Sequence, residues 1–324
     1  MERKPMRVIF GETLKELADT YPNLVVLDSD TSSSTQTKIF GDAYPERFFN
    51  CGIAEGNMVG MAGGMAACGM LPVAAAFAFL IALRAGDDVR SLIAHNRLNV
   101  KLAGSYCGLS DFADGASHQS VSDVGVIRSI PEITILSPSD MITTKAAIRA
   151  MLDYEGPVYL RLSREAVGNC HSPDINFEIG KAYCVRPGKD ITIAASGAVL
   201  EIVLEAAEQL KAAGIDAEIL DFTTIKPFDA ELLIRSAKKT GFVISVEEHN
   251  IFGGLGSAVA EVLGENYPVR MKRIGINDCF GESGSYLQLL EKHGLSVQNI
   301  VRTAKVFCAA SRRTNDFGSM QSTL

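Results

Sequence analysis

The sequence predicts an α/β protein built as two three-layer α/β/α domains with mostly parallel sheets. At 324 residues the chain is about twice an average domain in length. Short apolar runs alternate with segments of helical periodicity in both halves, as in parallel sheets covered by helices. The alternation lapses near residues 168–189, which have the composition of a connector. We therefore expect domains at 1–170 and 190–310, a linker at 171–189, and a tail at 311–324 that is a candidate for a mobile segment.

The first half contains five short apolar runs that are typical of strands buried on both faces. They span 23–28, 72–77, 99–104, 132–136 and 156–162. Apolar residues at helical spacing predict the intervening helices. These cover 8–21, a small-residue segment from about Asn57, 87–95, part of 118–130, and 138–154, where Ser139 or Asp140 is the candidate cap.

The second half repeats the alternation. Strands are expected at 190–197, 216–221, 241–248 and 268–276, and helices at 198–213, 229–239 and 255–263. Open α/β sheets bind ligands at the carboxyl ends of their strands, so the residues that follow each strand are the first candidates for a site.

Composition excludes several classes of function. A net charge of -7 and a pI near 5.4 argue against nucleic-acid binding, which needs clustered basic residues. Seven cysteines without a CxxC pair and five scattered histidines show no zinc-ligand spacing and indicate reduced thiols. We see no signal peptide, and the most apolar run, 71–83, is too short to cross a bilayer. We expect a cytoplasmic protein with no membrane or nucleic-acid partner.

The segment from Phe49 to Leu80 holds a single charged residue, Glu55, in an apolar and glycine-rich run. A structural interpretation is a carboxylate near a helix N-terminus, with Gly60, Gly63 and Gly64 allowing close helix packing. A functional interpretation is a buried carboxyl group within reach of a base, because burial favours the neutral form that can donate a hydrogen bond. Spacing alone favours the structural interpretation.

Three other segments are candidates. DFADGASHQS places Asp114 and His118 four residues apart between a strand and a helix, where the alternative is an ordinary turn. Arg164 ends the strand in YLRLSR, and is either a solvated arginine or a fork for an anion. The GGLGS segment after a strand is a weak dinucleotide signal, because the third glycine of GxGxxG would fall at Val259.

Together these segments resemble the C-terminal half of transketolase. The matching stretches are VVLDSD, FNCGIAEGNMVGMAGGMA, PVAAAFAFL, DGASHQSVSDVGVIRSIP, YLRLSR, ISVEEHNIFGGLGSAVAEVL and GINDCFGESGS, in the family's order across most of residues 7–305. The chain looks like the smaller subunit of a split transketolase, which carries the pyrimidine-binding domain and the C-terminal domain.

The resemblance implies thiamine diphosphate as cofactor. In the family, the glutamate at the position of Glu55 hydrogen-bonds the aminopyrimidine ring and favours the tautomer that removes the C2 proton of the thiazolium. Phe77 matches the aromatic residue that packs on the pyrimidine, and Leu80 and Asp30 are expected beside it. Leu80 and Leu83 stand where the family often has aromatic residues, so this wall would stack less on the ring.

The resemblance also implies a sugar site. Asp114 and His118 match residues that bind substrate hydroxyls, and His118 is the second expected catalytic residue. Arg164, Ser34 and Arg7 match groups that hold the sugar phosphate. Tyr106 stands where a typical transketolase has another substrate histidine, so the donor could carry a different terminal group, such as a sulfonate, or be an unphosphorylated branched sugar.

The family's GDG motif, which binds Mg²⁺ and the diphosphate, is missing. The chain has GDA at Gly41 and GDD at Gly86, neither in a suitable setting. We expect a partner chain that carries the diphosphate- and Mg²⁺-binding domain, with two copies of each chain in the assembly.

Other readings stay open. The chain could be a subunit of another thiamine-diphosphate enzyme, like deoxyxylulose-phosphate synthase or the beta subunit of a 2-oxoacid dehydrogenase. It could also be a non-catalytic α/β partner subunit, since a fold never fixes a function.

Overall fold

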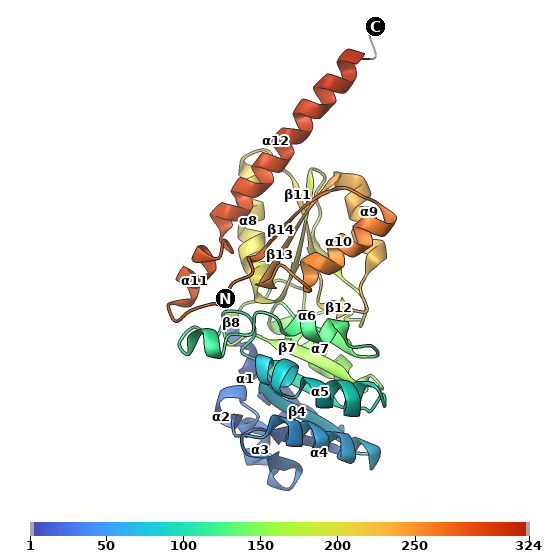
Figure 1. Cartoon of the computed structure of the whole chain (residues 1–324), viewed down its shortest axis with the longest axis vertical. Coiled ribbons are helices and arrows are strands. Elements are labelled where there is room, and N and C mark those ends of the chain that lie inside the picture. The colour runs from blue at the N-terminus through green and yellow to red at the C-terminus, as the bar shows by residue number, and fades with distance from the viewer. Residues whose placement is uncertain (1–2, 322–324) are drawn as a thin grey trace.

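The first domain is built on a seven-stranded sheet in the computed structural model, which describes residues 3–321 and the side chains of residues 3–309. Figure 1 shows this sheet in the lower part of the molecule. All neighbouring strands are parallel except the edge strand β12. From edge to edge the order is β12 (Thr224–Lys226), β6 (Thr134–Leu136), β7 (Val158–Leu162), β5 (Lys101–Ser105), β4 (Leu71–Phe77), β2 (Leu24–Asp28) and β3 (Phe48–Asn50).

Helices cover both faces of this sheet because alternate strand residues point to opposite sides. In β4, Val73 and Ala75 pack with α1 and α7, whereas Ala74 and Ala76 pack with α4. The helices are α1 (Met6–Leu17), α2 (Ser32–Thr35), α3 (Lys38–Ala43), α4 (Glu55–Ala67), α5 (Gly86–Asp88), α6 (Asp123–Ser129) and α7 (Met141–Asp153). Wider π-helical turns occupy Leu80–Arg84 and Val89–Ala94, on either side of α5.

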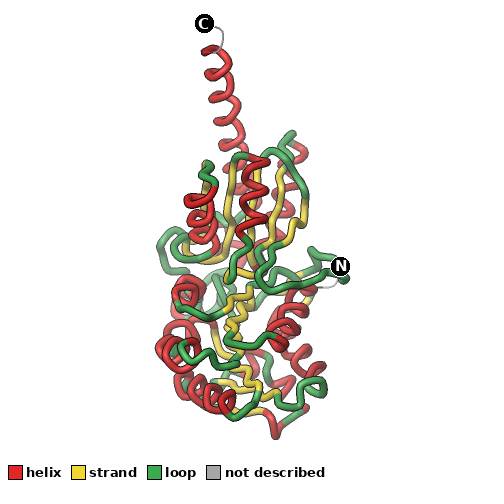
Figure 2. Tube along the Cα trace, turned by 90° about the vertical axis from the view of Figure 1, so that its right-hand side faces the viewer, coloured by secondary structure: helices red, strands yellow, loops and turns green. Residues whose placement is uncertain are grey.

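The second domain has a five-stranded sheet in which only the edge strand β9 is antiparallel. Its order is β14 (Arg270–Ile276), β13 (Phe242–Asn250), β10 (Ile191–Ser196), β11 (Ala217–Asp221) and β9 (Tyr183–Arg186). One face packs on α8 (Leu200–Ala212) and α12 (Val297–Gln321), and the other on α9 (Ala230–Thr240) and α10 (Leu255–Asn266). Figure 2 shows the helices on the two sides of this sheet, with α12 extending beyond the body of the domain.

The predicted fold class is confirmed, with several differences in detail. Strand β3 was not predicted, and β9 lies within the segment expected to be a linker. The short strand β12 comes from the second half of the chain but pairs with β6, so the second half adds one edge strand to the first sheet. The sequence pattern fades after Lys305, yet α12 continues to Gln321, and residues 322–324 lie outside the described part of the chain. Of the two candidate caps for α7, Asp140 is the one used: its carboxylate accepts from the Thr143 amide at 2.7 Å.

Small elements complete the described chain. A two-stranded ribbon joins β1 (Lys4–Pro5) to β8 (Ala166–Val167), and α11 (Tyr286–Lys292) precedes α12. Within residues 3–321, every helix is too short or too polar to cross a membrane.

Candidate active site

Glu55 is the first residue of α4, and its side chain is almost completely buried, with 1% exposed. Its Oε2 atom accepts from Nη1 of Arg84 at 3.1 Å. The Oε1 atom is also buried and has no hydrogen-bond partner among the described residues. One oxygen of the Glu55 carboxylate is therefore held by a half-exposed arginine. The other oxygen is available to bind a group from another molecule.

The glycines of α4 are explained in part by packing inside the chain. A Cβ atom on Gly63 would lie 3.0 Å from Cδ1 of Ile93, and one on Gly56 would lie 2.6 Å from Oδ2 of Asp88. A larger residue at either position would push the end of the Ile93 or Asp88 side chain aside, so both glycines let α4 lie close to the helical turns at 86–94. A Cβ atom on Gly64 would meet nothing within 4 Å, so the chain itself leaves that side of the helix open.

An aromatic group lies at the carboxyl ends of β4 and β5. The ring of Phe77 is 4.7 Å from that of Tyr106 and 5.8 Å from that of His118. Phe79 adds an edge contact to His118 at 5.5 Å. Leu80 points into the hydrophobic core, whereas Leu83 is largely exposed.

Two arginines flank Tyr106. Arg7 donates from Nη1 to the Tyr106 hydroxyl at 2.8 Å and to the carbonyl oxygen of Ser34 at 2.9 Å. The guanidinium carbon of Arg164 lies 5.1 Å from the centre of the Tyr106 ring, which is cation–π distance. Segments far apart in sequence thus place two cations around one tyrosine.

Asp111 connects this group to Asp114. Its buried carboxylate accepts from Nη1 of Arg164 at 3.0 Å. Burial, together with the nearby charge of Asp114, raises the pKa of Asp111 to about 6 against the opposing effect of Arg164. The carboxyl group of Asp111 therefore titrates close to neutral pH. Its contact with Arg164 orients that side chain towards the aromatic group.

The structure brings most of the predicted residues into one cluster at the carboxyl edge of the first sheet, as expected for an open α/β fold. The cluster consists of Arg7, Ser34, Phe77, Tyr106, Asp114, His118 and Arg164. Glu55 contacts Arg84, and Asp30 accepts from Nδ2 of Asn50 at 3.0 Å, so neither is tied to this cluster by direct contacts.

Four residues of the site region were not predicted: Arg84, Phe79, Asp111 and Asp28. Asp28 ends β2 and holds the loop that carries Ser34, because its carboxylate accepts from the hydroxyls of Thr35 and Thr37 at 2.7 and 2.8 Å. Burial raises the pKa of Asp28 against the opposing hydrogen bonds. The sequence could have indicated Asp28 and Asp111 as site residues, because each lies at or soon after the carboxyl end of a predicted strand.

The GGLGS segment does not form a dinucleotide site. Gly254 precedes α10, and the carboxylate of Glu247 accepts from the amides of Leu255 and Gly256 at 2.6 and 2.7 Å. This helix N-terminus, where a phosphate would bind in a dinucleotide fold, is already occupied by a carboxylate of the chain itself.

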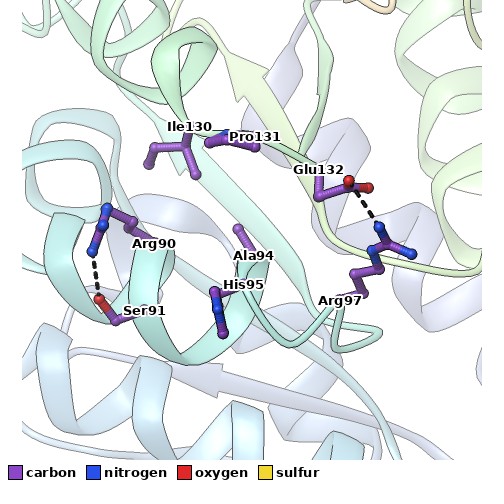
Figure 3. Close-up of a pocket in the computed structure, with 8 residues that line it drawn as sticks. All are labelled: Arg90, Ser91, Ala94, His95, Arg97, Ile130, Pro131 and Glu132. Atoms are coloured by element: carbon purple, nitrogen blue, oxygen red, sulfur yellow. Dashed lines mark hydrogen bonds and ion pairs between the residues drawn. The ribbon is translucent and has the colours of Figure 1, made fainter.

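A separate groove of about 560 Å³ lies between the 89–97 region and residues 130–132 (Figure 3). Arg97 and Glu132 form an exposed ion pair at 3.0 Å on one side of it, and Arg90 donates to Ser91 at 3.1 Å on the other. None of the residues that line it belongs to the cluster above. No group of three or more His, Cys, Asp or Glu side chains that could hold a metal occurs within residues 3–309.

The two halves of the chain match two family models, which define the class of protein. Residues 2–169 match the transketolase pyrimidine-binding domain, and residues 180–300 match the transketolase C-terminal domain. A pyrimidine-binding domain of this type implies thiamine diphosphate. The chain therefore belongs to the transketolase family.

Individual relatives narrow the class. A putative transketolase C-terminal section from Methanocaldococcus jannaschii is 44% identical over 302 residues, which cover 92% of this chain and 95% of the relative. A 6-deoxy-6-sulfo-D-fructose transketolase subunit from Clostridium is 41% identical over 94% of both chains. A solved split-gene transketolase, described as an inactive beta4 tetramer, superimposes with a TM-score of 0.87 at 44% identity and covers 93% of this chain and 97% of its own. The chain thus corresponds to the C-terminal subunit of a split transketolase.

Proposed function

We propose that this chain, together with a partner subunit that carries the diphosphate- and Mg²⁺-binding domain, transfers a two-carbon ketol unit from an anionic ketose to an aldose. The observation that carries the proposal is the pairing of a free buried oxygen on Glu55 with a separate cation-rich cluster around Tyr106. The free oxygen of Glu55 suits the cofactor, and the cation-rich cluster suits the anionic sugar.

The residues present fit the aminopyrimidine of thiamine diphosphate. Glu55 Oε1 is buried without a partner among the described residues, which is costly unless a ligand supplies one. Phe77 presents an aromatic ring at the end of β4 and, with Asp30, belongs to the proposed cofactor side, which Leu80 would support from the core behind it. When bound, thiamine diphosphate supplies the electron sink that allows a ketose C2–C3 bond to break.

Glu55 is the proposed catalytic carboxylate, because it can exchange a hydrogen bond and a proton with a ring nitrogen. Its burial excludes water from that contact, which strengthens the interaction. Arg84 donates to Oε2 of Glu55, so Oε1 is the oxygen that stays available for the ring nitrogen. Both residues would act without contacting the sugar.

The cluster around Tyr106 is the proposed sugar site. His118 and Asp114 would bind hydroxyl groups, with His118 also placed to relay protons. Arg7, Arg164 and Ser34 would bind the terminal anion, since guanidinium groups suit phosphate and sulfonate oxygens alike. Tyr106 hydrogen-bonds Arg7 and so orients that guanidinium without adding a charge of its own.

A partner chain is part of the proposal. The sequence lacks a GDG motif, and the described side chains include no metal-binding cluster. The similar split-gene chain is described as inactive as a beta4 tetramer, which agrees with a requirement for the other subunit. We propose an assembly with two copies of each chain and the cofactor between them.

The test is a donor panel with both chains, thiamine diphosphate and Mg²⁺. The panel contains xylulose 5-phosphate, 6-deoxy-6-sulfo-D-fructose and unphosphorylated ketoses, with pyruvate as a control for a decarboxylase. Ketol transfer from an anionic donor, preferred over its neutral analogue, is the expected result. Equal turnover of all donors would remove the proposed role of the arginines, and CO₂ release from pyruvate would favour a 2-oxoacid enzyme.

A further inference from the structure

The loop between β5 and α6, residues 107–122, carries Asp111, Asp114 and His118 but has little regular structure of its own. The structure describes one short 3-10 turn at Gly115–Ser117 and bridges from Ser120 to Cys107 and Gly108. A loop this irregular needs contacts from elsewhere to hold its side chains in one geometry.

Glu248, at the carboxyl end of β13 in the second domain, supplies one such contact. Its Oε1 atom accepts from the amide of Leu109 at 2.6 Å, and its Oε2 atom accepts from the hydroxyl of Tyr286 at 2.7 Å. The approach is close: a Cβ atom on Gly108, whose φ is +63°, would lie 2.6 Å from Cδ of Glu248. Glu248 is 3% exposed, so this contact is shielded from water.

The segment that leads into α11 holds the middle of the loop. The amide of Gly284 donates to the carbonyl oxygen of Phe112 at 3.0 Å, and Nε2 of Gln119 donates to the carbonyl oxygen of Glu282 at 3.0 Å. The far end of the loop is held by the amide of Asn250, which donates to the carbonyl oxygen of Val121 at 2.7 Å. The second domain therefore contacts the loop near both ends and in the middle.

A line of contacts continues from this support to the candidate site. The ring of Tyr286 lies 6.4 Å from that of Phe112, and the guanidinium carbon of Arg164 lies 4.9 Å from the centre of the Phe112 ring. Arg164 is in turn bonded to Asp111 and stacked on Tyr106. A shift at Tyr286 would thus reach the anion-binding side of the site through packed groups.

We propose that the C-terminal domain acts as a clamp on the β5–α6 loop, with Glu248 and Tyr286 as positioning residues for the ketose site. Neither residue touches the sugar in this scheme. Their contribution is to keep Asp111, Asp114 and His118 in place before substrate arrives, so that binding does not have to order the loop. The link to the ketose rests on the proposed function, whereas the clamp itself does not.

The experiment combines hydrogen exchange of residues 107–122 with ketol-transfer kinetics of the two-chain enzyme. The variants are Tyr286→Phe, Glu248→Gln and Glu248→Ala. The matched control is Thr192→Val, which removes a buried hydroxyl that bonds Ser236 and Thr240 in the same domain, away from the loop.

We expect Tyr286→Phe and Glu248→Ala to speed exchange in the loop and raise KM for the ketose about tenfold, with a smaller change in kcat, as for the loss of a buried bond to a charged group. Glu248→Gln keeps an acceptor for Leu109 and should recover part of the effect. Thr192→Val should leave the loop unchanged.

Unchanged loop exchange and KM in Tyr286→Phe and Glu248→Ala would overturn the clamp, and so would equal effects in Thr192→Val. Tyr286→Phe keeps the ring and its packing, so the test stands even where Glu248→Ala does not fold. Faster loop exchange in the variants, alongside a wild type that transfers no ketol unit, would support the clamp and count against the proposed function.

Discussion

The candidate site has two regions that differ in what holds them. Glu55 has one side-chain partner, Arg84, which is half-exposed, and one of its buried oxygens is unpaired among the described residues. The region around Tyr106 is tied by Arg7, Arg164 and Asp111 to several segments of the chain. The chain therefore organises its proposed sugar side in advance and leaves its proposed cofactor side open to another molecule.

The largest expected effect tests the open side. Glu55→Gln should lower kcat of the two-chain enzyme by about a thousandfold, within the range of a lost acid–base group. Glu46→Gln changes an exposed glutamate of the same domain and should leave kcat unchanged. A Glu55→Gln variant that retains more than a tenth of the wild-type kcat, with an unaltered circular dichroism spectrum, would show that Glu55 is not the catalytic carboxylate.

Glu248, which holds the clamp on the proposed sugar side, should make the stability of the chain depend on pH. Burial raises the pKa of Glu248 to about 7, from 4.5 in an exposed chain. The unfolded chain then releases its proton at lower pH than the folded one, so stability falls as pH rises from about 4.5 through 7. The loss is on the order of 3 kcal/mol at 1.36 kcal/mol per pH unit.

Chemical denaturation of wild type and Glu248→Gln at pH 5 and pH 8 checks this sign. Glu248→Gln should reduce the decrease in unfolding free energy between the two pH values by its own share, about 3 kcal/mol. The remaining decrease is expected from other buried carboxyl groups, such as Asp221, whose pKa burial raises to about 7. A variant with the same pH dependence as wild type would mean that Glu248 is ionised in the folded chain throughout.

A substitution of Arg164 tests whether the region around Tyr106 binds the anion of the donor. Arg164→Met should raise KM for the anionic donor about tenfold to 150-fold, because a bond to a charged group is worth about 1.5–3 kcal/mol. The control is Arg97→Met, which breaks only an exposed ion pair with Glu132. Equal KM values for Arg164→Met and wild type would show that Arg164 does not bind the terminal anion of the donor.

The smallest expected effect is that of Arg84. Its side chain is 56% exposed, so its ion pair with Glu55 is screened and worth no more than about 1 kcal/mol. Arg84→Gln should therefore change kcat/KM less than about fivefold. A decrease in kcat/KM as large as that of Glu55→Gln would mean that Arg84 is part of the catalytic machinery. The region around Glu55 would then be held in advance, like the region around Tyr106.

The sequence was sufficient for the fold class because most of the longer strands and helices have a strong local pattern. The exceptions are segments whose structure is set by distant contacts. Strand β12 has three residues, too few to show a period, and exists because β6 offers a free edge.

The site was predictable where the family resemblance named a residue and unpredictable where a contact joins distant segments. Arg84 lies 29 residues from Glu55, and Asp111 lies 53 from Arg164, so neither pair follows from spacing. The contact between Leu109 and Glu248 spans 139 residues and two domains. Such pairings depend on the packed fold, and periodicity carries no information about them.

We propose above all that this chain supplies an open cofactor side that a partner chain completes. The most direct test titrates a fixed amount of this chain with its partner, in thiamine diphosphate and Mg²⁺, and measures ketol transfer and cofactor binding together. We expect neither signal from this chain alone, and both should rise to saturation at one partner per chain. Full activity without the partner, or a saturated mixture that binds no thiamine diphosphate, would overturn the proposal.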